Sequence, residues 1–226
     1  MDAGFPSRDE AEAAGVLIGT PVVYRPRILS LAGNRIAGTA IDDRAGCAAL
    51  VLLAEALAGR EGGPTVHICF TVQEEFNLRG AAPLAAALEP DIAIQIDLML
   101  ATDTPDMAER GEMRLGGGPG ISLYSFHGRG TLNGVIPHPG MVALFERTAE
   151  ETGLTLQRSA QTGVLTDLSY VQLQGAGVAA IDVGFPMRYS HSSLEVCDLA
   201  DLAGLVTLLE AALSRIGPSF DPREGR

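Results

Sequence analysis

The sequence predicts an α/β protein with a mostly parallel, mixed sheet flanked by helices. Three observations support this fold class. Apolar residues make up 46% of the 226 positions and charged residues 19%, a balance typical of a chain with a packed core. Runs of β-branched residues alternate with segments of helical periodicity, which predicts strands covered by helices. The length suits one main domain and leaves room for a small second module.

The first part of the chain is predicted to be a short β-rich module. Residues 8–14 have helical periodicity, and residues 15–24 are typical of short strands joined by a turn. Residues 44–58 then form a predicted helix, with Asp42 and Asp43 at its start and Gly59 at its end.

The rest of the chain alternates between strand-like and helix-like segments. The predicted strands are 65–72, 92–96, 120–125, 154–158 and 178–183. The predicted helices are 78–88, 139–152 and 198–216. Pro139 stands at the first position of its helix and Gly153 follows the last, which is the usual placement of these two residue types.

Composition excludes several classes of function. The formal net charge is −12, and all 16 cationic residues are arginines scattered singly, so nucleic acid is not an expected partner. Without lysine there can be no Schiff-base nucleophile, pyridoxal-phosphate anchor or lysine-containing phosphate loop. We expect the separated Cys47, Cys69 and Cys197 to be buried free thiols in the cytoplasm. No targeting or membrane-spanning segment is expected.

Acidic residues follow two predicted strands. Glu74 and Glu75 come after strand 65–72, Asp97 comes after strand 92–96, and His191 follows strand 178–183 through a loop. Ligands of open α/β sheets bind at the carboxyl ends of the strands, so these side chains can converge there with Asp42 and Asp43. Carboxylates gathered in one place repel each other, and a divalent cation removes that cost. An Asp/Glu/His set suits zinc, cobalt or manganese.

Each element also has an ordinary structural explanation. Asp42 and Asp43 can simply favour a helix N-terminus, Glu74 and Glu75 a solvated strand end, and Asp97 a turn. His191 can be a loop residue paired with Ser190 or Glu195. The three remaining histidines have no expected functional role: His67, His127 and His138. A common metal site explains why the acidic groups occupy equivalent ends of their strands.

Four motifs in order resemble the co-catalytic two-metal aminopeptidases, which include glutamyl, deblocking and tetrahedral aminopeptidases. The motifs are Ala40-Ile-Asp-Asp-Arg-Ala-Gly-Cys47, Val72-Gln-Glu-Glu-Phe-Asn-Leu-Arg-Gly-Ala81, Ile96-Asp97 with Asp103-Thr-Pro105, and Pro186-Met-Arg-Tyr-Ser-His-Ser-Ser-Leu-Glu-Val196. The resemblance extends over nearly the whole chain. It implies a phosphorylase/hydrolase-like zinc-peptidase fold and the release of N-terminal residues from peptide substrates.

The resemblance also implies site residues. Asp42 would bridge two zinc or cobalt ions, Glu75 and Asp97 would each bind one of them, and His191 would complete the site that holds Glu75. These are the expected metal ligands.

Two further acidic residues are implied to take part in catalysis. Glu74 would be the general base, and Asp43 would orient the neighbouring ligands. In such families the peptide bond between the two aspartates is often cis.

The chain also departs from the family pattern. It lacks the strand with a Gly-His-x-Asp motif, whose histidine is a ligand, so an N-terminally truncated member with as few as one metal ion is expected. Residues 1–36 would be the remnant of the inserted β domain through which members form homo-oligomers, and residues 37–226 the catalytic domain. The family's Gly-Thr-Asp appears as Val164-Leu-Thr-Asp167, which makes Asp167 a weaker candidate.

Two other functions stay open on the sequence. A non-catalytic remnant could act as a scaffold or binding subunit, which the lost histidine favours and the intact Glu74 opposes. Related carboxypeptidases and deacylases share the metal scaffold, but their motifs differ from Asp-Asp-Arg and Arg-Tyr-Ser-His.

Overall fold

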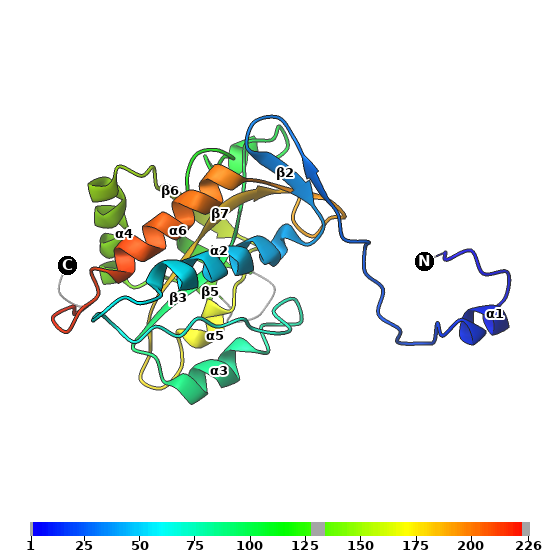
Figure 1. The fold of residues 1–226 in the computed structure, drawn as a ribbon, viewed down its shortest axis with the longest axis horizontal. Helices are drawn as coiled ribbons and strands as arrows, with labels where there is room; N and C mark the ends of the chain where they lie inside the picture. The colour runs from blue at the N-terminus through cyan, green and yellow to red at the C-terminus, as the bar shows by residue number, and fades with distance from the viewer. Residues whose placement is uncertain (1, 128–133, 223–226) are drawn as a thin grey trace.

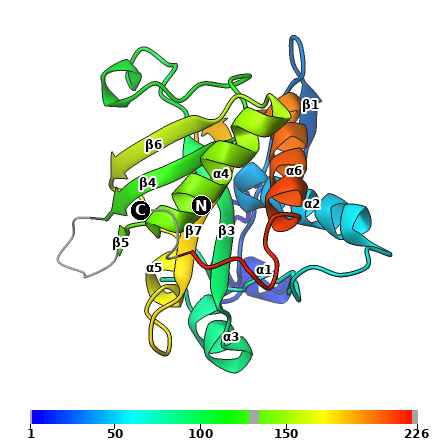
Figure 2. The ribbon, with the colours of Figure 1, turned by 90° about the vertical axis from the view of Figure 1, so that its left-hand side faces the viewer.

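The computed structural model describes residues 2–127 and 134–222. These residues form an eight-stranded sheet with helices on both faces, so the predicted α/β class is confirmed. Figures 1 and 2 show the sheet body, and Figure 1 shows an N-terminal arm that extends away from one end of it. In the described part of the chain, no helix is both long and apolar enough to cross a membrane.

The strands range from two to ten residues. They are β1 (Ile28–Ser30), β2 (Arg35–Gly38), β3 (Ile92–Leu100), β4 (Gly120–Phe126), β5 (Gly134–Val135), β6 (Gln157–Thr162), β7 (Ala179–Arg188) and β8 (Glu195–Asp198).

The helices include three long ones. They are α1 (Arg8–Ala13), α2 (Ile41–Leu57), α3 (Ala81–Leu88), the 3₁₀ helix η1 (Ala108–Arg110), α4 (Pro139–Thr152), α5 (Leu168–Val171) and α6 (Leu199–Leu213).

The sheet is mixed, but it is not mostly parallel as predicted. Its order is β1-β2-β8-β7-β4-β5, with β3 beside β7 and β6 beside β4. Only β3–β7 and β4–β6 are parallel pairs, and the other pairs are antiparallel. Parallel strands need a long crossover, whereas short loops such as those between β1 and β2 and between β7 and β8 return the chain antiparallel.

The main core lies between the sheet and helices α2, α4 and α6. On β7, Ile181, Val183 and Phe185 belong to this core, whereas Ala180 packs with Leu168 of α5 on the opposite face. Successive side chains of a strand point to opposite faces, so Asp182 shares the α5 face with Ala180. One face of β7 therefore packs into the core, and the other face carries the polar side chain of Asp182.

Local signals predicted most of the later elements. Helix α4 has the predicted bounds, with Pro139 in its first turn and Gly153 as its left-handed cap. β3 is longer than the predicted strand 92–96 and β6 begins later than the predicted strand 154–158. The three cysteines are free thiols, as expected, but only Cys197 is buried, whereas Cys47 and Cys69 are partly exposed.

Two strand predictions are wrong. Residues 15–24 contain no strand, and residues 65–72 also form no strand. The β-branched residues of this segment predict a buried strand, yet Val66, Phe70 and Val72 are exposed. In the described residues, β3 has β7 as its only strand partner. An isolated run without a neighbour to accept its backbone hydrogen bonds does not form a ladder.

The N-terminal arm consists of residues 2–24, which precede β1, and has no buried residue. Helix α1 lies within it, well away from the body of the molecule (Figure 1). Its apolar side chains, such as Ile18 and Val23, are exposed in the described structure. The arm contributes nothing to the core described above.

Candidate metal centre

The first contributor to the site is the start of α2. The peptide bond between Asp42 and Asp43 is cis, and both residues have non-helical backbone angles within the assigned helix. The backbone N–H of Gly46 donates to Asp43 Oδ1 at 3.1 Å. A Cβ atom at Gly46 would overlap the Asp43 carboxylate, so this close approach requires glycine.

The second contributor is the loop that carries Glu74 and Glu75. Because residues 65–72 do not form a strand, this loop is held by turns rather than by a sheet. Leu78 N–H donates to the carbonyl of Glu74 at 2.8 Å, and Arg79 N–H to that of Gln73 at 3.2 Å. Gln73 has a positive φ of 58°, which turns the chain just before the two glutamates.

The third contributor is the loop between β7 and β8, which carries His191. Its backbone N–H donates to Glu195 Oε1 at 3.0 Å. The other oxygen of Glu195, Oε2, accepts the backbone N–H of Asp42 at 2.9 Å. Glu195 is buried, so one carboxylate fixes the backbone of two separate loops.

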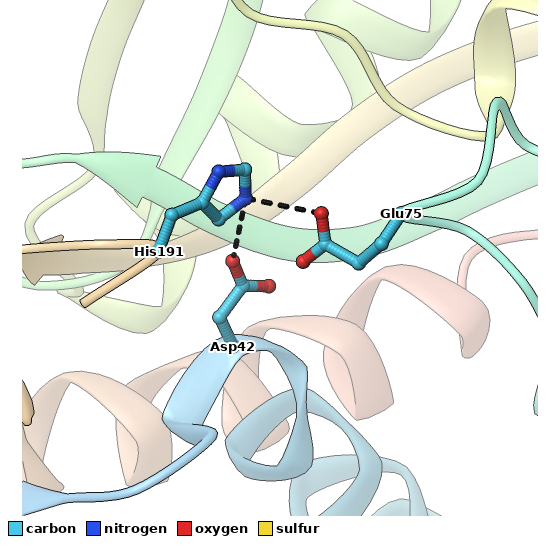
Figure 3. A group of neighbouring side chains, drawn as sticks. All are labelled: Asp42, Glu75 and His191. Atoms are coloured by element: carbon cyan, nitrogen blue, oxygen red, sulfur yellow. Dashed lines mark ion pairs between the residues drawn. The ribbon is translucent and has the colours of Figure 1, made fainter. Parts of the chain in front are cut away.

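These elements bring three predicted ligands together, and we call Asp42, Glu75 and His191 the triad (Figure 3). His191 Nε2 lies 3.3 Å from Asp42 Oδ2 and 3.2 Å from Glu75 Oε2. One ligand atom from each residue lies within 4.8 Å of the other two. The His191 side chain is 70% exposed and that of Glu75 54%, so the group is open to solvent. Two carboxylates and one imidazole suit zinc or a similar divalent ion and leave positions for other ligands.

Asp97 is not part of this three-residue group. It lies in the middle of β3 rather than at the end of a strand, and its Oδ1 accepts the backbone N–H of Leu98 at 2.7 Å. Burial and the charges of Asp43, Asp42 and Glu74 raise its pKa well above the ordinary value. Asp97 therefore faces the same acidic cluster without sharing the close contacts of the triad.

The acidic residues raise one another's pKa. Burial, followed by the charges of Glu75 and Glu195, raises the pKa of Asp42 to about 6. Burial raises the pKa of Asp43 to about 8, against the opposing hydrogen bond from Gly46. Burial and the charges of Glu75, Asp167 and Asp42 raise the pKa of Glu74 to about 7. A cation bound among these groups would favour their charged forms.

Two other aspartates from the sequence analysis have different environments. Asp103 forms a two-point ion pair with Arg188, with both distances 2.7 Å, so its oxygens are already engaged. Asp167 is buried, and its Oδ2 accepts a hydrogen bond from Thr71 Oγ1 at 2.7 Å. The charge of Asp167 also raises the pKa of Glu74, so Asp167 lies near the acidic cluster.

Sequence reasoning missed the structural role of Glu195, which was considered only as a partner for His191. Its spacing of four residues from His191 was a signal for the loop contact. The contact of Glu195 with Asp42 joins residues 153 positions apart, so no local sequence pattern indicates it.

The fold and the triad define an α/β protein with a candidate site for a divalent metal. The chain belongs to the M42 glutamyl aminopeptidase family, whose model matches residues 1–208.

The chain is also similar in sequence to individual curated proteins. SgcX of Escherichia coli (strain K12) is 40% identical over 93% of this chain and 57% of its own length. Lysyl aminopeptidase of Pyrococcus furiosus is 30% identical over 98% of this chain and 61% of its own length. The chain therefore spans about three fifths of these curated relatives.

Among solved structures, aminopeptidase APDkam598 from Desulfurococcus kamchatkensis matches with a TM-score of 0.82 and 33% identity, over 93% of this chain and 57% of that chain.

Proposed function

We propose that this chain carries the catalytic centre of a metal-dependent aminopeptidase, which releases N-terminal residues from peptides. Membership of the M42 family supports the reaction class. The observation that carries the proposal is the convergence of Asp42, Glu75 and His191, which come from three separate segments of the chain.

In this proposal, Asp42, Glu75 and His191 hold one zinc or cobalt ion. Their ligand atoms lie close enough together to contact a common ion, and their types match its preferences. Asp42 would also hold a second ion together with Asp97, which lies in the same acidic cluster. Two carboxylates alone make a weaker site than the triad, so the second ion would bind less tightly.

Each ionisable group then has a distinct task. A bound divalent ion acts as a Lewis acid and lowers the pKa of water. Glu74 is the general base, which accepts a proton from the attacking water and passes it to the leaving amine. Asp43 holds the start of α2 through its hydrogen bond with Gly46 and so positions Asp42.

The remaining assignments follow the family. We propose that residues 37–226 form the catalytic domain and residues 1–36 a remnant of an inserted β domain, most of which lies outside the core. A homo-oligomer is proposed because one similar structure, the Pyrococcus horikoshii TET1 peptidase, assembles into a tetrahedron or a large octahedral shell. The free thiols suit a cytoplasmic location.

The function is tested by hydrolysis of a panel of aminoacyl p-nitroanilides by the purified chain, with added zinc or cobalt and with a chelator. We expect at most weak turnover, which requires the metal and is lost in His191→Ala. Tight metal binding without turnover of any substrate would instead support a non-catalytic remnant. Turnover that persists in the chelator would contradict the metal mechanism.

A further inference from the structure

A small cavity lies between β3, β4, β6 and β7, where strand β4 is irregular. Its volume is about 20 Å³, which is room for about one group the size of a water molecule. The pairing of β4 with β7 is limited to Gly120 and Ile121. The register of β4 with β6 shifts between Ser122 and Tyr124, which both line the cavity. Bulges of this kind often lie next to functional sites.

Two buried polar atoms of the cavity wall have no hydrogen-bond partner among the described residues. They are Oδ2 of Asp182 on β7 and the hydroxyl oxygen of Ser125 on β4, and both residues are 3% exposed. The other oxygen of Asp182, Oδ1, accepts a hydrogen bond from Thr166 Oγ1 at 2.7 Å. Buried polar atoms normally have a partner, so two of them in the wall of one small cavity indicate a ligand that contacts both.

The charge around the cavity favours a cation over a water molecule. Asp167 is a second buried carboxylate, and its charge adds to the effect of burial, which raises the pKa of Asp182 to about 7. In the described part of the chain, neither aspartate forms an ion pair with an arginine or a histidine. A buried carboxylate without a cationic partner is costly, and a bound cation offsets that cost, whereas a neutral water molecule does not.

The size of the cavity and its oxygen atoms fit a potassium ion. An ion that enters must exchange its water for oxygens of the wall, because there is room for about one group. Magnesium keeps several waters, and the usual zinc sites contain nitrogen or sulfur ligands. Potassium is close to a water molecule in size, and protein oxygens can replace its hydration shell. Besides Asp182 and Ser125, four polar residues line the cavity: Ser122, Ser159, Gln161 and Thr166.

We propose that this cavity binds one potassium ion, with Asp182 Oδ2 and Ser125 Oγ as two of its ligands. The ion joins β7 to β4 at a point where the direct pairing of these strands has ended. It also lies beside Asp97, which forms part of the cavity wall, and so supports the strand that carries this aspartate. The inference concerns a site separate from the triad and does not depend on the proposed aminopeptidase function.

Thermal unfolding of the full chain tests the proposal, with a chelator present to remove divalent ions. The comparison is between potassium chloride, sodium chloride and choline chloride at equal ionic strength. An ion that binds only the folded chain raises the unfolding temperature as its concentration increases. We expect potassium to raise the unfolding temperature in a saturable way, sodium to have a weaker effect and choline to have none.

Variants assign this effect to the cavity. Asp182→Asn should weaken the apparent potassium affinity about 10- to 100-fold, because it removes the charge of a ligand. Ser125→Ala should also weaken it. Ser169→Ala is the matched control, since the hydroxyl of Ser169 is also buried and lacks a partner among the described residues, but Ser169 is not part of the cavity wall. His191→Ala, which alters the triad, should leave the potassium effect unchanged.

Diffraction from crystals in which rubidium replaces potassium locates the ion, because rubidium has a strong anomalous signal and water has none. We expect a peak between Asp182 and Ser125. The wild-type chain decides the question even if a variant does not fold: stabilisation by potassium no greater than that by sodium or choline, or a cavity that holds only water, would overturn the proposal. An unchanged potassium effect in folded Asp182→Asn and Ser125→Ala would overturn it as well.

Discussion

Glu195 accepts the backbone N–H of Asp42 at 2.9 Å, although the two residues lie 153 positions apart in the chain. Its second oxygen accepts the N–H of His191 at 3.0 Å. A single buried carboxylate therefore sets the distance between two predicted ligands of the same ion. Neither of these hydrogen bonds involves a ligand atom, so Glu195 acts as a positioning residue.

Glu195→Gln should weaken zinc binding while the fold is retained. Glutamine keeps one acceptor oxygen and places an amide donor against the other backbone N–H, so one of the two loops loses its anchor. Changes to groups that support ligands typically reduce metal affinity about 10- to 100-fold. Competition with a chromophoric zinc chelator measures the change, and Glu55→Gln, at an exposed position of α2, is the matched control. Equal affinities for both variants would exclude the positioning role.

The triad predicts one tightly bound zinc ion per chain. Asp42, Glu75 and His191 provide three ligands, whereas Asp97 lies outside their group. His191→Ala should remove most of the bound zinc, and His67→Ala, at an exposed histidine outside the site, should not. Elemental analysis after gel filtration gives the stoichiometry. Two tightly bound equivalents would show that other residues complete a second site.

Glu74→Gln separates the general base from the ligands. Glu74 is outside the three-residue group, so the variant should bind zinc like the wild type. If the wild-type chain is active, turnover should fall by about 10²- to 10⁴-fold, the usual contribution of a general base. Glu112→Gln, at an exposed glutamate, serves as the control. Loss of zinc together with activity would assign Glu74 as a ligand instead.

Local sequence signals predicted elements whose boundaries depend on nearby residues. Helix α4 is the clearest case, because Pro139 favours its first turn and Gly153 adopts the left-handed cap. Residues 65–72 could have formed a strand only beside a neighbouring strand, and no local pattern reveals whether such a neighbour is present. The direction of strand pairing also depends on non-local connections. For that reason, the prediction of a mostly parallel sheet was wrong.

The candidate site was predictable in part. Motif resemblance singled out Asp42, Glu75 and His191, which the structure brings together. The argument from strand ends was weaker, because Asp97 lies inside β3 and Glu75 lies in a loop that follows no strand. The unused oxygen of Asp182 and the double contact of Glu195 depend on side-chain packing, which the sequence pattern does not encode.

The metal-free chain should become less stable as the pH rises from about 4 to 8. Folding raises the pKa of Asp42 to about 6, of Glu74 to about 7 and of Asp43 to about 8, whereas unfolded carboxyl groups titrate near 4. Between these limits the folded chain holds more protons than the unfolded chain, so a rise in pH favours unfolding.

Zinc should reverse this trend at the upper end of the pH range, because it binds the charged carboxylates of the folded chain and competes with protons. Thermal unfolding across this pH range, with and without zinc, measures both effects, and His191→Ala should lack the zinc-dependent part. A metal-free chain that gained stability from pH 5 to 8 would contradict the raised pKa values of this cluster.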